Sequence, residues 1–381
     1  MHEDEDYDAA AFIMPCTPTD PPLPSDDVEP EYLRELHPVP WFDDHVRMHR
    51  GRHVYVLDGV DLPISTTGHM KQFVGEFDAE AKSKQILERL RTYERNKAAG
   101  FQREPADWLV RQYERYKHCQ TAEEIRHEWN IVRDAGTFAH RLIELYYNRM
   151  LEGPLTTHSA LRTREFQQFL RFDATHVQAQ GYLPFRTEFT MQRYEIGGQI
   201  DMLYQHRDDA ADPARRHLLW MVDWKRKFEL GDHGDALKAP FANMPPGDRT
   251  KFTIQLNTYK AMIEALTPYR ITRMTVLLVH PEMNDYYMEE LVDIQPQIAI
   301  MFEERRLALI ERKCQIAGDI ALLQARNVKD TSGARGTALH EARRLIEQAI
   351  ALTSVPPPPK FEIMPTIVGN DDATEWDDFM L

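Results

Sequence analysis

The stretch HLLWMVDWKRKFEL, residues 217–230, constrains the fold more than any other part of the chain. Its five consecutive apolar residues, Leu218–Val222, predict a strand that is covered on both faces. Asp223 and Lys225 follow two positions apart, so both point to one face of the strand while Trp224 points to the other. The strand therefore places an anion beside a cation at the edge of a hydrophobic layer, where a buried charge needs a partner or a metal ion.

A salt bridge at the end of a strand would explain this pair, but a second carboxylate occupies a similar position. Asp201 interrupts the apolar strand predicted for GGQIDMLYQH, residues 197–206. If the two strands pair in a meander, the carboxylates of Asp201 and Asp223 meet across it. Two converging carboxylates repel each other unless a cation joins them. Hard oxygen ligands of this kind suit Mg²⁺ or Mn²⁺.

Further candidate ligands come from neighbouring segments. His140 and Glu144 are four residues apart in GTFAHRLIELYYN, so they share one face of a predicted helix. An imidazole that faces two carboxylates would add a third ligand, and Glu188 in RTEF is another candidate on a strand. Taken singly, His140 has an ordinary structural explanation as a satisfied histidine.

A similar polar pair follows the predicted strands. Gln255 and Tyr259 are also four residues apart, on a predicted helix that begins beside Lys251. The pair is suited either to contact a phosphate backbone or to brace the site. Its ordinary explanation is an exposed polar helix face.

The periodicity of the chain predicts an α/β fold with a small mixed sheet flanked by helices. Alternating Val, Leu and Ile residues around Asp58-Gly59 predict a β-hairpin at 53–66. Strands are predicted at 185–194, 197–206, 217–227, 271–281 and 287–294, with Gly197-Gly198 as the turn between the first two. Helices are predicted at 66–73, 79–98, 105–117, 121–151, 164–180, 251–266, 296–324 and 336–353.

The charge is concentrated at the two ends. Residues 1–31 hold ten of the acidic residues and 361–381 hold six, with no Lys or Arg in either segment. The rest of the chain is therefore close to neutral although the net charge is −15, and nucleic acid remains a possible ligand. We expect an acidic, proline-rich disordered tail at 1–40 and a proline-rich linker with an acidic tail at 355–381. The second tail could hold a protein partner.

Composition also limits the location and the cofactors. We find no apolar run long enough to span a membrane, and the acidic N-terminus is unlike a signal or transit peptide. We therefore expect an intracellular soluble protein, cytoplasmic or nuclear. Cys16, Cys119 and Cys314 are far apart, so their spacing predicts neither a metal cluster nor a disulfide framework.

A basic patch surrounds the charged strand. WKRKF, residues 224–228, includes Lys225, Arg226 and Lys227, and Lys251 follows in the next predicted helix. Together with interleaved Trp224 and Phe228, these side chains could hold a phosphate backbone and stack on unpaired bases. A solvated strand end explains the same residues.

The order of these motifs resembles the PD-(D/E)XK nuclease superfamily, in particular its RecB-like exonuclease branch. The matching positions are His140 in GTFAH, Glu188, Asp201 in GGQIDM, Asp223-Trp-Lys225, and Gln255 with Tyr259. The hairpin that leads into LPISTTGHM also resembles phage, large-virus and mitochondrial genome-maintenance members. The resemblance covers residues 50–295.

The resemblance implies a restriction-endonuclease-like core and a metal-dependent DNA phosphodiesterase. By this resemblance Asp201, Asp223 and His140 bind Mg²⁺ or Mn²⁺, and Lys225 orients or helps to deprotonate the attacking water. Gln255 and Tyr259 contact the DNA backbone or support the site, and Glu144 and Glu188 are secondary candidates. Asp223 stands where glutamate is commoner. The cysteine cluster of some relatives is absent, which predicts no iron–sulfur cluster.

These expectations define the domains and the competing functions. A nuclease domain is expected at 41–295, with the hairpin and helices at 50–180 and the catalytic core at 181–295, followed by a helical extension at 296–354. The leading function is an exonuclease that acts on single-stranded DNA or DNA ends in replication, recombination or repair. An endonuclease on DNA or RNA is one alternative. A nucleic-acid-binding or scaffold protein with a weakened site is another.

Overall fold

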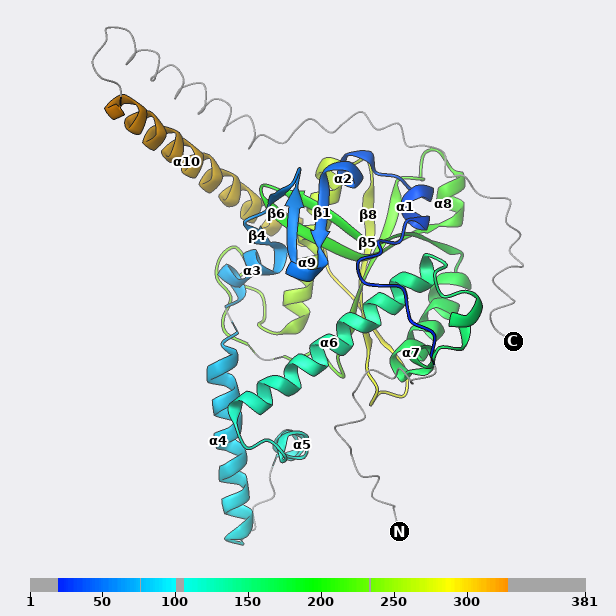
Figure 1. The fold of residues 1–381 in the computed structure, drawn as a ribbon, viewed down its shortest axis with the longest axis vertical. Coiled ribbons are helices and arrows are strands. Elements are labelled where there is room, and N and C mark those ends of the chain that lie inside the picture. Colours follow the sequence, from blue (N-terminus) through cyan, green and yellow to red (C-terminus); the bar gives the residue numbers. More distant parts are fainter. Residues whose placement is uncertain (1–19, 76, 101–105, 233, 328–381) are drawn as a thin grey trace.

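A computed structural model of the protein describes residues 20–75, 77–100, 106–232 and 234–327 (Figure 1). The predicted helix at 336–353, the tail at 355–381 and Cys16 lie outside the described residues.

A mixed sheet lies at the centre of the described fold. Its strands run in the order β4-β6-β7-β8-β9, and β5 pairs with β6. These strands are β4 (Ile64–Ser65), β5 (Tyr182–Arg193), β6 (Ile196–His206), β7 (Leu218–Arg226), β8 (Arg270–Val279) and β9 (Tyr287–Glu290). β5, β6 and β7 form an antiparallel meander, and α9 (Asp248–Leu266) connects β7 to the parallel strand β8. The predicted meander is confirmed.

Helices cover both faces of this sheet, which confirms the predicted α/β class. α6 (Ala122–Tyr147) and α7 (Arg164–Phe172) pack on one face, around Trp220 and Trp224. α3 (Thr66–Val74), α9 and the first turns of α10 (Gln295–Asn327) pack on the other, around Met221 and Ile254. The alternation within β7 therefore works as expected, because Trp224 enters one hydrophobic layer while Asp223 and Lys225 point to the opposite side.

Two helical projections extend from this body. α4 (Ala79–Ala98), α5 (Asp107–Tyr116) and the start of α6 form an arm with a small core of its own, centred on Leu90 and Ile125. Figure 1 shows α4 pointing away from the sheet at one end and α10 at the other. Among the described residues, no helix is both long and apolar enough to cross a membrane.

A second, three-stranded sheet contains the predicted hairpin. It is formed by β1 (Val46–His49), β2 (Val54–Leu57) and β3 (Val60–Asp61), all antiparallel. Asp58 and Gly59 connect β2 and β3 with positive φ angles of 51° and 81°, as a primed hairpin turn requires. Ser65 then accepts a hydrogen bond from Gly68 N and caps α3. The hairpin and the helix start are both confirmed.

The remaining described elements are short. They are α1 (Tyr32–Leu36), α2 (Pro40–His45), a 3₁₀ turn between β1 and β2 (Arg50–Arg52), two further 3₁₀ turns (Gly153–Thr157 and Ser159–Arg162), a π-helical segment after α7 (Asp173–Gln178) and α8 (Arg207–Ala211).

The prediction of a disordered segment at 1–40 is wrong for residues 20–40. In this part the side chain of Leu33 is buried, and Arg141 on α6 donates hydrogen bonds to the carbonyls of Ser25 and Val28. A folded neighbour therefore satisfies two carbonyls of this segment, which a composition argument cannot foresee. Residues 1–19 lie outside the described part of the chain.

The predicted turn at Gly197-Gly198 is also wrong. The turn between β5 and β6 is made by Tyr194 and Glu195, whose φ angles are 52° and 60°. Gly197 lies inside β6, where an added Cβ would stand 2.3 Å from Cγ of Tyr55. Gly198 is also tightly packed, since an added Cβ would stand 2.7 Å from Cε1 of Tyr259. The glycines are needed for close packing rather than for turning.

Candidate metal centre

The site forms where β6 and β7 separate. Their ladder runs from Tyr204↔Trp220 to Met202↔Val222, and Asp201 and Asp223 are the next residue on each strand. Beyond this point the backbone hydrogen bonds between the two strands stop, and a side chain accepts instead: Trp224 N donates to Oδ2 of Asp201 over 2.8 Å. The divergence of two central strands thus leaves both carboxylates at one opening of the sheet.

Glu188 on β5 faces the same opening. Thr187 pairs with Met202 and Phe189 pairs with Ile200, so Glu188 lies opposite Asp201. Its φ angle of 46° is in the left-handed region, which is unusual for a non-glycine residue inside a strand. Such a conformation costs on the order of 1–3 kcal/mol and tends to occur at functional sites.

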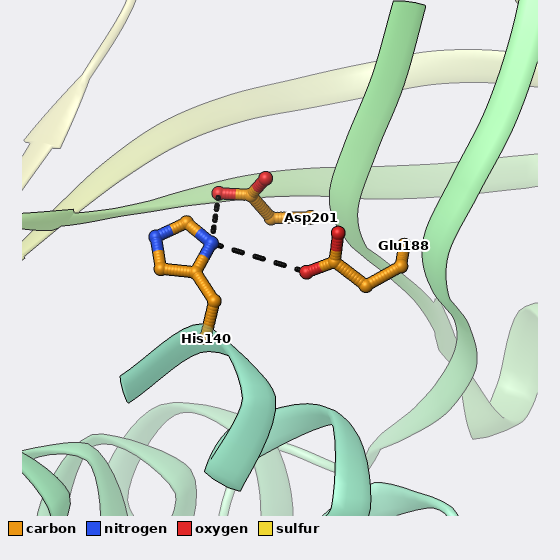
Figure 2. A group of neighbouring side chains, drawn as sticks. All are labelled: His140, Glu188 and Asp201. Atoms are coloured by element: carbon orange, nitrogen blue, oxygen red, sulfur yellow. Dashed lines mark ion pairs between the residues drawn. The ribbon is translucent and has the colours of Figure 1, made fainter. Parts of the chain in front are cut away.

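His140 completes a group of three from the side of α6. Its Nδ1 lies 3.5 Å from Oδ2 of Asp201 and 3.9 Å from Oε1 of Glu188, as Figure 2 shows. Burial lowers the pKa of His140, but the negative charges of Asp201 and Glu188 outweigh it and raise the pKa to about 9. The imidazole therefore carries a proton at neutral pH when these two carboxylates are its only counter-charges.

These three residues, which we call the metal group, have the composition of a divalent metal site. One ligand atom from each of His140, Glu188 and Asp201 lies within 4.8 Å of the other two. Burial raises the pKa of Asp201 despite the opposing charges of His140 and Lys225, so this carboxylate lacks full compensation. One imidazole and two carboxylates fit Mg²⁺, Mn²⁺ or another divalent ion.

Asp223, also predicted as a metal ligand, lies outside this group of three and pairs with Lys225. Its Oδ2 forms an ion pair with Nζ of Lys225 at 2.6 Å, and it is not among the three clustered ligands. Burial raises the pKa of Asp223 to about 7 although Lys225 opposes the shift. Burial lowers the pKa of Lys225, but Asp223 and Asp201 outweigh it and raise that pKa. Lys225 is therefore a stable cation beside the metal group.

The predicted pair on α9 lies beside the site with its two side chains in contact. Gln255 Nε2 donates to Oη of Tyr259 over 3.0 Å. The pKa of Tyr259 lies well above its usual value, mainly because the side chain is buried. The charges of Asp223 and Asp201 raise it further. Because Tyr259 is buried, it cannot contact a DNA backbone, and bracing is the role that remains for it.

Several other predicted residues are occupied elsewhere. Glu144 accepts hydrogen bonds from Arg50 Nη2 (2.5 Å) and Arg141 Nη1 (2.7 Å), so its charge is neutralised away from the metal group. Arg226 donates to Glu165 over 2.8 Å with its side chain buried, which contradicts a direct role in nucleic-acid binding.

The rest of the predicted basic patch is only partly available. Lys227 forms an ion pair with Asp248, and Lys251 is half-buried nearby on α9. Trp224 is buried against α7 and cannot stack on bases, whereas Phe228 is exposed. The positive charges predicted to form a surface along WKRKF are therefore largely held in ion pairs within the protein.

The structure adds two residues that sequence reasoning missed. Tyr55 on β2 packs against Gly197, and burial followed by the charges of Glu188 and Asp201 raises its pKa. Arg50 lies near enough to Glu188 for that carboxylate to raise its pKa, together with Glu144, against the effect of burial. The run RMHRGRH at 47–53 was the available signal for Arg50, and only the fold places it here.

Comparison with known proteins adds little to this picture. No protein-family model and no curated protein matches the chain. Among solved structures, the crystal structure of SSO0001 aligns with 64% of this chain and 92% of its own, at 11% sequence identity and a TM-score of 0.21. A similarity of this size supports no argument about fold or function.

Proposed function

We propose that this protein is a divalent-metal-dependent nuclease that hydrolyses DNA phosphodiester bonds, with Mg²⁺ or Mn²⁺ held by His140, Glu188 and Asp201. The observation that carries the proposal is the convergence of these three ligands with the Asp223–Lys225 pair at the opening between β6 and β7. The same residues, in the same order along the chain, resemble the PD-(D/E)XK nucleases.

The chemistry of phosphodiester hydrolysis matches what these residues offer. The reaction needs a polarised phosphate, an oriented water and a stabilised leaving oxygen. A divalent ion in this site would supply the Lewis acid that polarises the phosphate. Lys225, which Asp223 holds in place, adds positive charge next to it. Lys225 carries its positive charge in an ion pair with Asp223, so we assign it to charge stabilisation and to orienting water.

The immediate test is cleavage of end-labelled linear single-stranded DNA in Mg²⁺ or Mn²⁺. We expect EDTA, Asp201→Asn and Lys225→Met each to lower the rate on the order of 10²-fold or more, because each removes charge stabilisation from the transition state. Asp285→Asn is the matched control, since this carboxylate pairs with Arg171 on the surface. It should cleave at the wild-type rate.

The products decide between the forms of the proposal. Mononucleotides or short oligomers released from linear DNA are expected of an exonuclease. Cleavage of circular single strands would establish an endonuclease instead. If wild-type protein cleaves neither DNA nor RNA with either metal, the catalytic proposal fails, and a binding or scaffold role replaces it.

A further inference from the structure

The turn between β1 and β2 has an unusual composition. Residues 45–57 contain three arginines and three histidines and no acidic residue. We call residues 47–53, with the sequence RMHRGRH, the β1–β2 basic turn. It combines the end of β1, the 3₁₀ turn Arg50–Arg52 and His53, whose φ angle is 49°. Nothing in the catalytic proposal accounts for this concentration of positive charge.

The charges at the tip of this turn face solvent. The side chains of Arg47 and Arg52 are 58% and 51% exposed, and His49 and His53 are exposed as well. Arg52 pairs with Asp61 at 2.7 Å, and Arg47 lies 3.8 Å from Glu29. Exposed pairs of this kind are weak, so a phosphate can replace the carboxylate at little cost.

The same turn borders the metal centre. Arg50 contacts Glu144, which lies one helical turn after His140 on α6. A pocket beside this contact is lined by Arg47, Arg50 and Glu144, and also by Glu188 of the metal group. This pocket therefore connects Glu188 of the metal centre with Arg47 and Arg50 of the β1–β2 basic turn.

The interior of this pocket is not the anion site. Its lining contains four arginines and four acidic residues, so the formal charges cancel: Arg34, Arg47, Arg50 and Arg186 against Glu29, Asp43, Glu144 and Glu188. The positive charge that a ligand can reach lies at an exposed rim formed by Arg47 and Arg52, whose surface pairs with Glu29 and Asp61 a phosphate can replace. An extended polyanion that runs along the rim fits this distribution better than a small anion inside.

We propose that the β1–β2 basic turn binds the phosphate backbone of the nucleic-acid strand whose scissile phosphate lies at the metal centre. The identity of the ligand rests on the proposed function. Arginine contacts to phosphate position a strand without reading its sequence. The turn thereby takes over a role that Arg226, whose side chain is buried against Glu165, cannot fill.

The test compares the double variant Arg47→Ala/Arg52→Ala with Lys84→Ala/Arg171→Ala in the full-length chain. Both remove two exposed, ion-paired cations, but Lys84 and Arg171 belong to α4 and α7. Binding of a 20-nucleotide single strand is followed by fluorescence anisotropy in EDTA, between 50 and 200 mM salt. Loss of two phosphate contacts should reduce the slope of log K against log salt by about 1.4 and weaken binding about tenfold. The control should stay within twofold of wild type.

Three results would overturn the proposal: unchanged binding in the turn variant, an equal loss in the control variant, or no binding of the strand by wild type. Polyglutamate is the competing polyanion. If it binds wild type as tightly as the oligonucleotide and loses the same affinity in the turn variant, the surface serves an acidic polypeptide instead.

A second substrate separates this proposal from the catalytic one. The p-nitrophenyl ester of thymidine 5′-phosphate needs the metal centre but has no extended backbone. We expect the turn variant to hydrolyse it at the wild-type rate in Mn²⁺ and Asp201→Asn to fail. If wild type does not hydrolyse the ester or DNA while the anisotropy results hold, the catalytic proposal fails and the nucleic-acid surface stands. A turn variant that loses ester hydrolysis would contradict the assignment to backbone binding.

Discussion

At the scale of single residues, His140 connects proton binding to metal binding. Its pKa of about 9 reflects the nearby carboxylates, and a metal ligand must be a neutral imidazole. We therefore expect Mn²⁺ affinity, measured by titration calorimetry, to rise about tenfold per pH unit between pH 7 and 8.5, because one proton leaves as the metal binds. His140→Gln should bind more weakly and lose this pH dependence. Equal wild-type affinity at both ends of the range would contradict the role of His140.

Lys225 provides the second prediction at this scale. The folded-state pKa of Asp223, about 7, lies above the ordinary value of 3.8 for an aspartate. The folded protein therefore binds this proton more tightly, and the stability contributed by this group falls as pH rises from about 4 to about 7. Removing the positive charge of Lys225 should make this loss of stability with rising pH larger. In EDTA we expect Lys225→Met to cost about 3 kcal/mol of unfolding free energy at pH 8 and much less at pH 4.5.

Urea denaturation at the two pH values measures this difference. Adding Asp223→Asn to Lys225→Met should restore most of the loss at pH 8, since a neutral pair leaves no uncompensated buried charge. A Lys225→Met variant with the same loss at both pH values would show that packing, not charge, explains the effect.

At the scale of elements, the contact between β6 and the hairpin depends on Gly197. A Cβ at this position would stand 2.3 Å from the Tyr55 ring, so Gly197→Ala must displace the hairpin that carries Tyr55. Overpacking of this kind costs about 1–3 kcal/mol. Thermal unfolding should show a lower Tm for this variant.

Gly318 in α10 is the matched control, because an added Cβ there has no neighbour within 4 Å. Gly318→Ala should raise stability by about 0.5–1 kcal/mol, as alanine does in a helix. A Gly197→Ala protein as stable as wild type would mean that β2 and β6 are not in contact.

The strand pattern itself was readable at this scale. Alternation in β7 correctly separated Trp224 from Asp223 and Lys225, and the bounds of α4 agree with the predicted 79–98. The prediction for the glycines of β6 was wrong because a Gly-Gly pair looks the same in sequence in two cases. It can form a turn, or it can leave room for a neighbouring aromatic ring. Only the position of Tyr55 and Tyr259 distinguishes these two uses.

At the scale of the whole molecule, residues 20–31 stabilise α6. Arg141 is buried and donates two hydrogen bonds to carbonyls of this segment, from Ser25 and Val28. Deleting residues 1–31 should therefore cost about 3 kcal/mol relative to deleting 1–19, because hydrogen bonds from a charged group are worth roughly 1.5–3 kcal/mol each. Urea denaturation of the two truncated proteins measures the difference. Equal stabilities would show that the segment does not support the fold.

The sequence by itself determined the class of the fold, most of the helices and strands, and the placement of Asp223 and Lys225 on one face of a strand. These features depend on periodicity within a short segment, which composition and order encode directly. His140, Glu188 and Asp201 were also recognised as candidates, but not as one group. The pairing of Asp223 with Lys225 and the left-handed backbone of Glu188 decide which carboxylates face His140.

Only the tertiary structure decided which charges remain available. Glu144 and Arg226 look as suitable in sequence as Asp201 and Lys225, yet Arg50 neutralises the first and Glu165 the second. The reason is physical, since a buried charge is stabilised by whatever opposite charge the fold brings within a few ångströms. Arg50 and Glu165 lie 94 and 61 residues away from Glu144 and Arg226 along the chain, beyond the reach of any local pattern. Arg141, the second partner of Glu144, is the exception, since it lies three residues away on the same helix.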